Sequence, residues 1–311
     1  MRLSIYFNLM PPKTITLTYG DVCESHVGMA KIGVLSQRGL SLQSLEETHH
    51  QLPSHSELIY LHQNSSQEPA ALLIIRDGVN LLLDGGYQAL YDEQNALQPD
   101  TKAFMRGRVV NKRARHNLCF SETGHPPDFA NGKGTVISFP QVPYTYALKT
   151  KIETLFGVAN LQCEGNYYYD TSKNTVGIGL HGDFERKIVV GVRIGDPMLL
   201  QFRWFYKFRP ISSGIRIMLN GGDIYAMSEK AVGHDWKRST IPTLRHAAGS
   251  NEFLDIENKR IEGSHPISIP PQISLSVDDI IVENDDVIGE NDDIIRENDD
   301  IIGDNADHIE G

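Results

Sequence analysis

The sequence has only three cysteines, and none of them forms a Cys-x-x-Cys pair. Cys23, Cys119 and Cys163 are widely spaced and odd in number, which argues against a disulfide framework and against a cysteine-ligated zinc site. Long apolar runs are also missing, since the run at residues 70–75 is far too short for a membrane helix. The N-terminus lacks the features of a signal peptide and is typical of a first strand. We therefore expect a soluble intracellular protein that has free thiols and no membrane partner.

The charges are unevenly distributed along the chain. Basic residues are scarce in one segment, and acidic residues are outnumbered in another. Residues 278–311 hold fourteen acidic groups and one basic group, whereas residues 102–245 hold twenty-one Lys and Arg against eleven Asp and Glu. The basic middle segment favours an anionic partner, either a nucleic acid or a carboxylate cosubstrate, although moderate patchiness is also common in proteins without such a partner.

The C-terminal segment is a repeat. Residues 278–305 repeat D-D-[IV]-I-x-[ED]-N every seven residues. A coiled coil is not expected, because each heptad has only two adjacent apolar residues, separated by poor helix formers. We predict a disordered acidic tail over 278–311 that competes with nucleic acid for the basic surface, preceded by a linker over 251–277.

Residues 1–100 are predicted to form a small α+β region of unknown role. Apolar spacing predicts a helix over 25–40 and a second helix over 41–52, with Ser41 as its cap. Two apolar runs over 70–86, separated by Asp77-Gly78, predict a β-hairpin.

Residues 101–250 are predicted to form the main domain. An amphipathic helix over 143–157 ends at a glycine and is followed by β-rich runs about ten residues apart. There are seven such runs, at 161–169, 176–182, 187–195, 197–205, 214–219, 222–227 and 240–248. This spacing predicts a mainly β fold, a sandwich or a double-stranded β-helix (jelly roll), with flanking helices.

A basic, loop-rich stretch at 102–134 opens this domain. Five cations within ten residues are candidates for phosphate contacts of a nucleic acid, and a solvated charged surface is the alternative. They are Arg106, Arg108, Lys112, Arg113 and Arg115.

A His-x-Asp pair, His181 and Asp183, ends one of the β-rich runs. Two histidines and one carboxylate can hold Fe(II) on one face and leave three positions open for a cosubstrate and O₂. For the third ligand we favour His234, which follows the run at 222–227, and His246 is the alternative.

An arginine within an apolar strand needs an anionic partner. Arg245, in the last β-rich run, is expected to face the interior and to bind the distal carboxylate of 2-oxoglutarate through its planar fork.

At residues of about 140–250, the sequence resembles the AlkB-like branch of the Fe(II)/2-oxoglutarate-dependent dioxygenases. The matching pieces are a helix at 144–157, Asn166 with Tyr168, His181 with Asp183, LLQF at 199–202, GGDIYAM at 221–227, His234 and TLRHAAG at 243–249. Two features depart from the pattern. The family usually has a second arginine six residues before the last one, where this chain has Ser239 next to Arg238. The loop after Tyr168 is longer than usual, so Tyr167 or Tyr169 can take its role.

The resemblance implies oxidative demethylation of alkylated nucleic acid, with Fe(II) as cofactor and 2-oxoglutarate and O₂ as cosubstrates. It implies that His181, Asp183 and His234 bind the metal, that Arg245, Asn166 and Tyr168 bind 2-oxoglutarate, and that no other catalytic residue is needed. Nucleic acid is then the expected partner, and the oligomeric state stays open. The alternatives are a hydroxylase of protein side chains or small molecules, and a jelly-roll binding module that has lost its metal.

Overall fold

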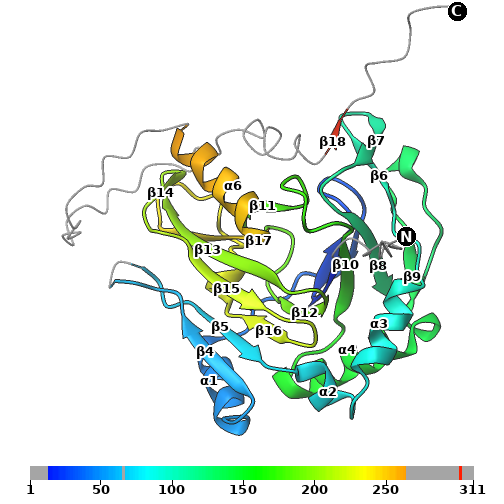
Figure 1. Ribbon diagram of the computed structural model, residues 1–311, viewed down its shortest axis with the longest axis horizontal. Coiled ribbons are helices and arrows are strands. Elements are labelled where there is room, and N and C mark those ends of the chain that lie inside the picture. Colours follow the sequence, from blue (N-terminus) through cyan, green and yellow to red (C-terminus); the bar gives the residue numbers. More distant parts are fainter. Residues whose placement is uncertain (1–12, 65–66, 264–300, 303–311) are drawn as a thin grey trace, which may run out of the picture.

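The computed structural model describes residues 13–64, 67–263 and 301–302. Within these residues the protein is mainly β, with two curled sheets that face each other and helices on the outside (Figure 1). The predicted mainly β class with flanking helices is therefore confirmed.

The larger sheet has eight strands and brings together distant parts of the chain. In spatial order they are β4 (Ser56–Tyr60), β5 (Ala71–Ile75), β16 (Ile224–Met227), β12 (Val190–Gly195), β1 (Thr14–Gly20), β10 (Gln162–Tyr168), β8 (His116–Ser121) and β9 (Val136–Ser138). Strand β1 lies in the middle and pairs antiparallel with both β12 and β10. The predicted division at residue 100 is thus not a break in the structure, because residues 1–100 supply three strands of this sheet.

The smaller sheet carries five strands. They are β11 (Gly177–His181), β17 (Thr243–Gly249), β13 (Met198–Tyr206), β14 (Arg209–Pro210) and β15 (Ile215–Leu219), which pairs with β13. Together, the two sheets account for all seven predicted β-rich runs, each of which contains one strand.

Helices cover the outer face of the eight-stranded sheet. These helices are α1 (Leu42–Gln51), α2 (Gly78–Leu82), α3 (Tyr87–Asn95) and α4 (Pro143–Phe156). Leu45, Leu90 and Leu148 of three of them join one apolar core with the sheet. The short α5 (Glu229–Val232) precedes β17, and α6 (Asn251–Gly263) follows it (Figure 1). The 3-10 helices are η1 (Phe129–Asn131) and η2 (Phe139–Gln141).

The alternation of side chains along β1 decides which face of the sheet is polar. Ile15, Leu17 and Tyr19 belong to the core beneath the helices. Thr16 and Thr18 point the other way, into a cavity between the two sheets. Strand β1 therefore separates the apolar core from the cavity.

Two of the predicted helices are confirmed by their caps. The hydroxyl of Ser41 accepts a hydrogen bond from the Ser44 amide at the start of α1. Helix α4 ends at Gly157, whose φ of 64° is in the left-handed region that favours glycine.

Two other predictions in the N-terminal region are wrong. In place of a helix over 25–40, the chain forms β2 (Val22–Glu24) paired with β3 (Lys31–Gly33). In place of a hairpin over 70–86, β5 is followed by α2, because β5 finds its partners in β4 and β16. Strand pairing overrode the local apolar spacing in both cases, between neighbouring segments for β2 and β3 and with the distant β16 for β5.

The basic stretch at 102–134 contains a hairpin of β6 (Lys102–Met105) and β7 (Arg108–Lys112). A short strand β18 (Ile301–Ile302) pairs with β7, and the rest of the predicted acidic tail lies outside the described residues. The predicted linker at 251–277 is in part a helix, since α6 occupies 251–263. None of the described helices combines the length and the apolar character of a membrane span.

Candidate metal centre

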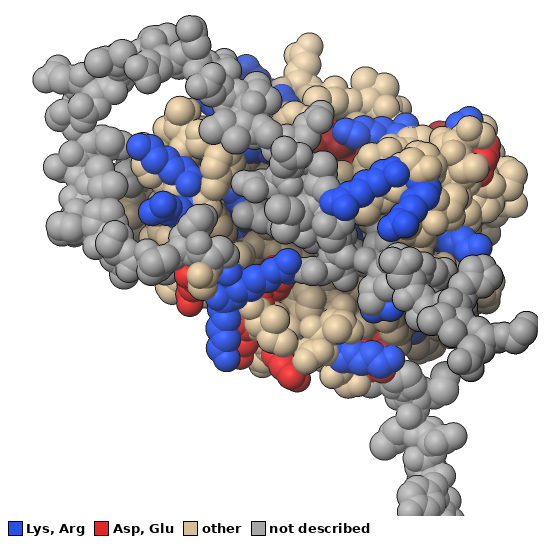
Figure 2. Space-filling model, turned by 90° about the horizontal axis from the view of Figure 1, so that it is seen from above, with Lys and Arg blue, Asp and Glu red and all other residues tan. Residues whose placement is uncertain are grey.

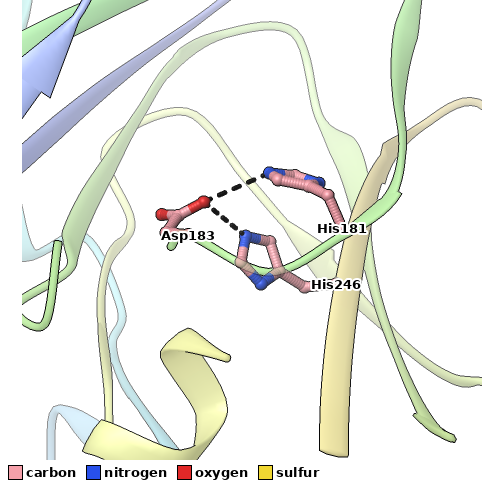
Figure 3. A group of neighbouring side chains, drawn as sticks. All are labelled: His181, Asp183 and His246. Atoms are coloured by element: carbon pink, nitrogen blue, oxygen red, sulfur yellow. Dashed lines mark ion pairs between the residues drawn. The ribbon is translucent and has the colours of Figure 1, made fainter. Parts of the chain in front are cut away.

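Three side chains meet at one end of the smaller sheet. His181, Asp183 and His246 each offer a ligand atom, and these atoms lie within 4.8 Å of one another. The Nε2 atoms of His181 and His246 are 3.3 and 3.6 Å from the same carboxylate oxygen of Asp183 (Figure 3). This is a group of two imidazoles and one carboxylate that can hold a metal ion.

Strand pairing and a tight turn position the three groups. His181 ends β11 and lies directly opposite His246 on β17. The chain then turns, and the amide of Asp183 donates to the carbonyl of Val232. Gly182 is required in this turn, because a Cβ there would collide with the carbonyl of Gly233 and with Trp236.

The hydrogen bonds of His181 leave one ring nitrogen for a metal. Its Nδ1 lies 2.8 Å from the carbonyl oxygen of Gly179, which can accept only if Nδ1 carries the proton. When the ring is neutral, Nε2 then carries the lone pair, and this atom lies close to the ligand atoms of Asp183 and His246.

The charges around Asp183 favour an ionised carboxylate, and the surroundings shift the pKa values of the two histidines in opposite directions. Burial opposes ionisation of Asp183, but Arg186 and His246 outweigh it and hold the pKa of the carboxyl well below its usual range. Burial, with His181 beside it, lowers the pKa of His246. For His181 burial acts in the same direction, but the hydrogen bond and charge of Asp183 outweigh it and raise the pKa.

A chain of polar contacts holds Asp183 from behind. Arg186 lies 3.6 Å from the second oxygen of Asp183 and donates to Glu164 at 2.6 Å. Glu164 in turn accepts from the amide of Asn166 at 3.0 Å, and Asn166 accepts from Arg115 at 2.9 Å. This series of polar contacts therefore extends from Asp183 across β10 to the basic stretch at 102–134.

The three groups open into a cavity of about 790 Å³ between the two sheets. Thr16, Tyr168, Arg193 and Tyr225 line it from the larger sheet. Arg193 is fully buried and donates to Thr16 Oγ1 at 2.6 Å. Its Nε and Nη2 atoms have no hydrogen-bond partner among the described residues, so the cavity holds a buried cation with open donors.

His234 is not part of the metal group, which corrects the predicted ligand set. The short helix α5 comes between β16 and His234 and carries the residue away from the end of the strand. The imidazole of His234 instead stacks on Phe184, with ring centroids 5.3 Å apart. The third side chain of the group that could hold a metal is His246, the alternative that the sequence had left open.

Arg245 does not face the cavity either. Neighbouring residues of a strand point to opposite faces, so Arg245 points away wherever His246 points in. Its guanidinium lies 4.2 Å from the ring centroid of Phe205 and 4.8 Å from that of Trp236. Arg193 was missed, although it sits between valine and isoleucine in an apolar strand and gives the same signal in the sequence.

Asn166 and Tyr168 both line the cavity. The two alternative tyrosines do not: Tyr167 donates to Gln94 beneath the helices, and Tyr169 donates to the carbonyl of Arg113. Of the three neighbouring tyrosines, Tyr168 is thus the one placed to meet a bound molecule.

The cations predicted to contact phosphates lie in different surroundings in the folded protein. Arg115 lines the cavity, whereas Arg106, Arg108 and Arg113 are exposed outside it. Lys112 is buried and donates to the carbonyl of Ser25 and to Asn117, and burial lowers its pKa to about 8. Lys112 is therefore a structural residue and not a surface cation.

No protein-family model matches the chain. An uncharacterized protein of the Acanthamoeba polyphaga mimivirus, R156, is 43% identical over 251 residues, which cover 78% of this chain and 98% of the viral protein. At this identity and coverage the two share one fold and one ancestry, and the chain belongs to the same protein family as uncharacterized protein R156.

Proposed function

We propose that the protein is an Fe(II)/2-oxoglutarate-dependent dioxygenase, similar to the AlkB-like branch, that removes alkyl groups from nucleic acid by oxidation. The observation that carries this proposal is one cavity with two features. A group of two histidines and one aspartate lines one side, and the buried guanidinium of Arg193 lines another.

The donor set fits Fe(II). Two imidazoles and one carboxylate occupy three positions of an octahedral ion and leave three open, as a non-haem iron oxygenase requires. The groups behind the ligands also fit, since Gly179 orients His181 and Arg186 faces Asp183.

The cavity also fits 2-oxoglutarate. In this proposal Arg193 takes the role that the sequence had assigned to Arg245. Its open donors offer a planar fork to the distal carboxylate of the cosubstrate, and Thr16 holds the guanidinium in place. Because burial lowers the pKa of Arg193, an anion beside it is favoured strongly.

The two facing sheets support the finer assignment of the fold as a double-stranded β-helix. That architecture places ligands at the ends of adjacent strands around a central cavity. His181 and His246 lie opposite each other on β11 and β17, which agrees with such a site.

Bound Fe(II), with 2-oxoglutarate and O₂, supplies oxidative hydroxylation of a substrate C–H bond. When an N-methyl group is hydroxylated, the product loses formaldehyde and leaves the free nitrogen. The residues of the chain bind and orient the reactants. A base within a duplex has to leave its stack to enter the cavity.

The mouth of the cavity favours a nucleic acid as substrate. Three exposed cations, Lys31, Lys237 and Arg260, line the cavity together with the half-buried Arg115. Figure 2 looks onto the end of the molecule that carries the β6–β7 hairpin, and Lys and Arg side chains are spread across that face. Cations around a deep pocket suit a phosphate backbone that holds one base inside.

The test is succinate formation from 2-oxoglutarate by the purified, iron-loaded protein. The assay compares methylated single-stranded DNA, methylated RNA and methylated peptides. We expect turnover with a methylated nucleic acid, and its loss in the His181→Ala and Asp183→Ala variants. Full turnover by either variant would reject the metal site, and turnover with peptides alone would favour a protein hydroxylase.

A further inference from the structure

One strand at the surface of the molecule has a partner from the far end of the chain. Strand β18 pairs antiparallel with β7, with Ile301 opposite Lys112 and Ile302 opposite Asn111 (Figure 1). On its other side β7 pairs with β6, so β18 occupies the outer edge of this three-stranded sheet. The chemistry proposed for the cavity gives this contact no role.

The outer edge of β7 is longer than the part that β18 covers. The amide of Lys112 donates to the carbonyl of Thr101, on the β6 side. Alternate residues of an antiparallel strand direct their backbone groups to opposite sides, so Asn111 and Val109 direct theirs to the outer edge. Among the described residues, β18 pairs as far as Asn111 and stops short of Val109, which is 42% exposed. This edge can therefore pair with a segment longer than β18.

Contacts within the protein hold the β6–β7 hairpin in place. Val110 packs against Met29 and Ala103 in a small apolar cluster. The turn at Arg106 and Gly107 has φ values of 51° and 78°, and two positive values are typical of the tight turn that joins twisted strands. Because β7 is already extended and anchored, its edge loses little entropy when a further strand pairs with it.

Strand β18 is part of the sequence repeat. Ile301 and Ile302 are the apolar pair of the fourth unit of D-D-[IV]-I-x-[ED]-N. The corresponding pairs of the other units are residues 280–281, 287–288 and 294–295. Two aspartates precede each pair, and each unit carries three acidic residues. The features that let the fourth unit pair with β7 are thus present in all four units.

The charges of the hairpin and of the repeat are complementary. Arg106, Arg108 and Arg113 are exposed on the hairpin or directly after it. In the sequence, Asp299 and Asp300 directly precede β18. The end of β7 lies opposite the start of β18, and this register favours opposite charges at that end of the pair. A docked unit therefore brings acidic groups to the cations that a polyanion would bind.

We propose that the outer edge of β7 is a docking site for the acidic repeats of the same chain, and that any of the four units can occupy it. Residues 264–300 tether β18 to α6, so docking within one molecule has a high effective concentration even for a short strand. A docked unit keeps a polyanion off the hairpin. The docking goes beyond the proposed function, whereas its consequence for nucleic acid rests on that function.

The experiment measures two properties of the full-length protein: backbone hydrogen exchange of β7 and affinity for a single-stranded oligothymidylate. Three variants keep every charge of the tail. The first replaces the apolar pairs of all four units by Ser, and the second carries only Ile301→Ser and Ile302→Ser. The matched control replaces four apolar residues before the repeat by Ser, namely Ile267, Ile269, Ile273 and Leu275.

Without the four apolar pairs, the outward amides of β7 should exchange about tenfold faster, the effect of losing one hydrogen bond. Affinity for the oligonucleotide at low salt should rise by the same factor, because the open hairpin is then always available. The second variant should stay within about twofold of the wild type, since three units remain tethered. The control should match the wild type in both measurements. High salt should remove the gain in affinity.

Four results would overturn parts of the inference. Unchanged exchange without the four pairs would reject docking of the repeats. Fast exchange in the Ile301→Ser, Ile302→Ser variant would reject the exchange of units. Protection that rises with protein concentration would assign the edge to the tail of a second copy. Faster exchange without a gain in affinity would keep the docking and reject its effect on polyanions.

The proposed function is tested separately. Absence of turnover with methylated nucleic acid in the wild type and in every tail variant would reject that function, while the exchange of β7 would still report the docking.

Discussion

The two faces of strand β17 place polar side chains in different surroundings. On the inner face, His246 meets His181 and Asp183 at the edge of the cavity. On the outer face, the next residue along the chain, Arg245, is enclosed by the rings of Phe205 and Trp236. Both residues are buried, at 6% and 0% exposure, so burial does not distinguish them.

What distinguishes them is whether a ligand can reach their polar atoms. The same contrast holds between two fully buried arginines, since Arg193 opens into the cavity and Arg245 lies against aromatic faces. A guanidinium on aromatic rings is held by packing and cation–π attraction. One that lines a cavity is stabilised when an anion arrives. Packing explains the position of Arg245, whereas the proposed function gives Arg193 a role in binding.

The largest effect should come from the inner face of β17. We expect His246→Ala to weaken Fe(II) binding by more than about a hundredfold, because loss of an outer-shell partner alone costs ten- to a hundredfold. His234→Ala, the matched control, should keep its metal. Metal content after anaerobic loading checks both. If His234→Ala lost the metal and His246→Ala kept it, the assignment of the metal ligand to the inner face of β17 would be wrong.

The second effect compares the two arginines. Arg193→Lys should raise the 2-oxoglutarate concentration for half-maximal turnover ten- to a hundredfold, since a point charge replaces a planar fork at a cost of about 1.5–3 kcal/mol. Arg245→Lys should leave that concentration unchanged and lower the thermal midpoint of unfolding. The reverse pattern would assign the cosubstrate to the outer face.

A third prediction concerns a buried acidic group, Glu24, and the way in which it makes the stability of the protein depend on pH. The pKa of Glu24 is about 8 in the folded protein and near its ordinary value of 4.5 in the unfolded chain. Between these values unfolding releases a proton, so this group lowers stability as the pH rises and its full cost is reached above pH 8. Glu24→Gln removes the titration.

Relative to wild type, the Glu24→Gln variant should gain stability on the order of 3 kcal/mol between pH 5 and pH 9. Urea unfolding at both pH values measures it, with Glu122→Gln as the control for a lost surface charge. A stability difference that does not change with pH would mean that the Glu24 carboxyl is hydrated in solution.

The smallest effect concerns cations outside the cavity. Replacing the exposed Arg106, Arg108 and Arg113 by Gln should flatten the salt dependence of single-strand binding by about 0.7 for each phosphate group that the protein no longer binds. Turnover at low salt should stay within about twofold. Lys112→Met should leave the slope unchanged, because that ammonium is buried against Ser25 and Asn117. A steeper slope in the triple variant would contradict a phosphate-binding role.

Sequence reasoning succeeded where local patterns decide structure. Ser41 and Gly157 mark helix ends, and all seven β-rich runs after residue 160 contain strands. His181 and Asp183, which the sequence singles out by their spacing, lie in the group of side chains that could hold a metal ion. These features depend on contacts within a few residues of each other.

It failed where the answer depends on distant pairing. The orientation of β17 follows from its register with β11 and β13, and that register decides that His246 faces inward and Arg245 outward. Arg193 lines the cavity only because β12 lies between β16 and β1. No pattern within either segment contains this information.

Strand β1 also sets the order of events during synthesis. Its two neighbours, β10 and β12, are encoded about 150 and 180 residues later, since Thr14 pairs with Tyr168 and with Gly195. At 5–20 residues per second, the first strand waits roughly 10 to 40 s before its place in the sheet exists. The first hundred residues therefore leave the ribosome without a completed sheet to join. Until β10 and β12 have been made, both edges of β1 lack the strands that they pair with in the folded protein, and unpaired strand edges are where another chain can add.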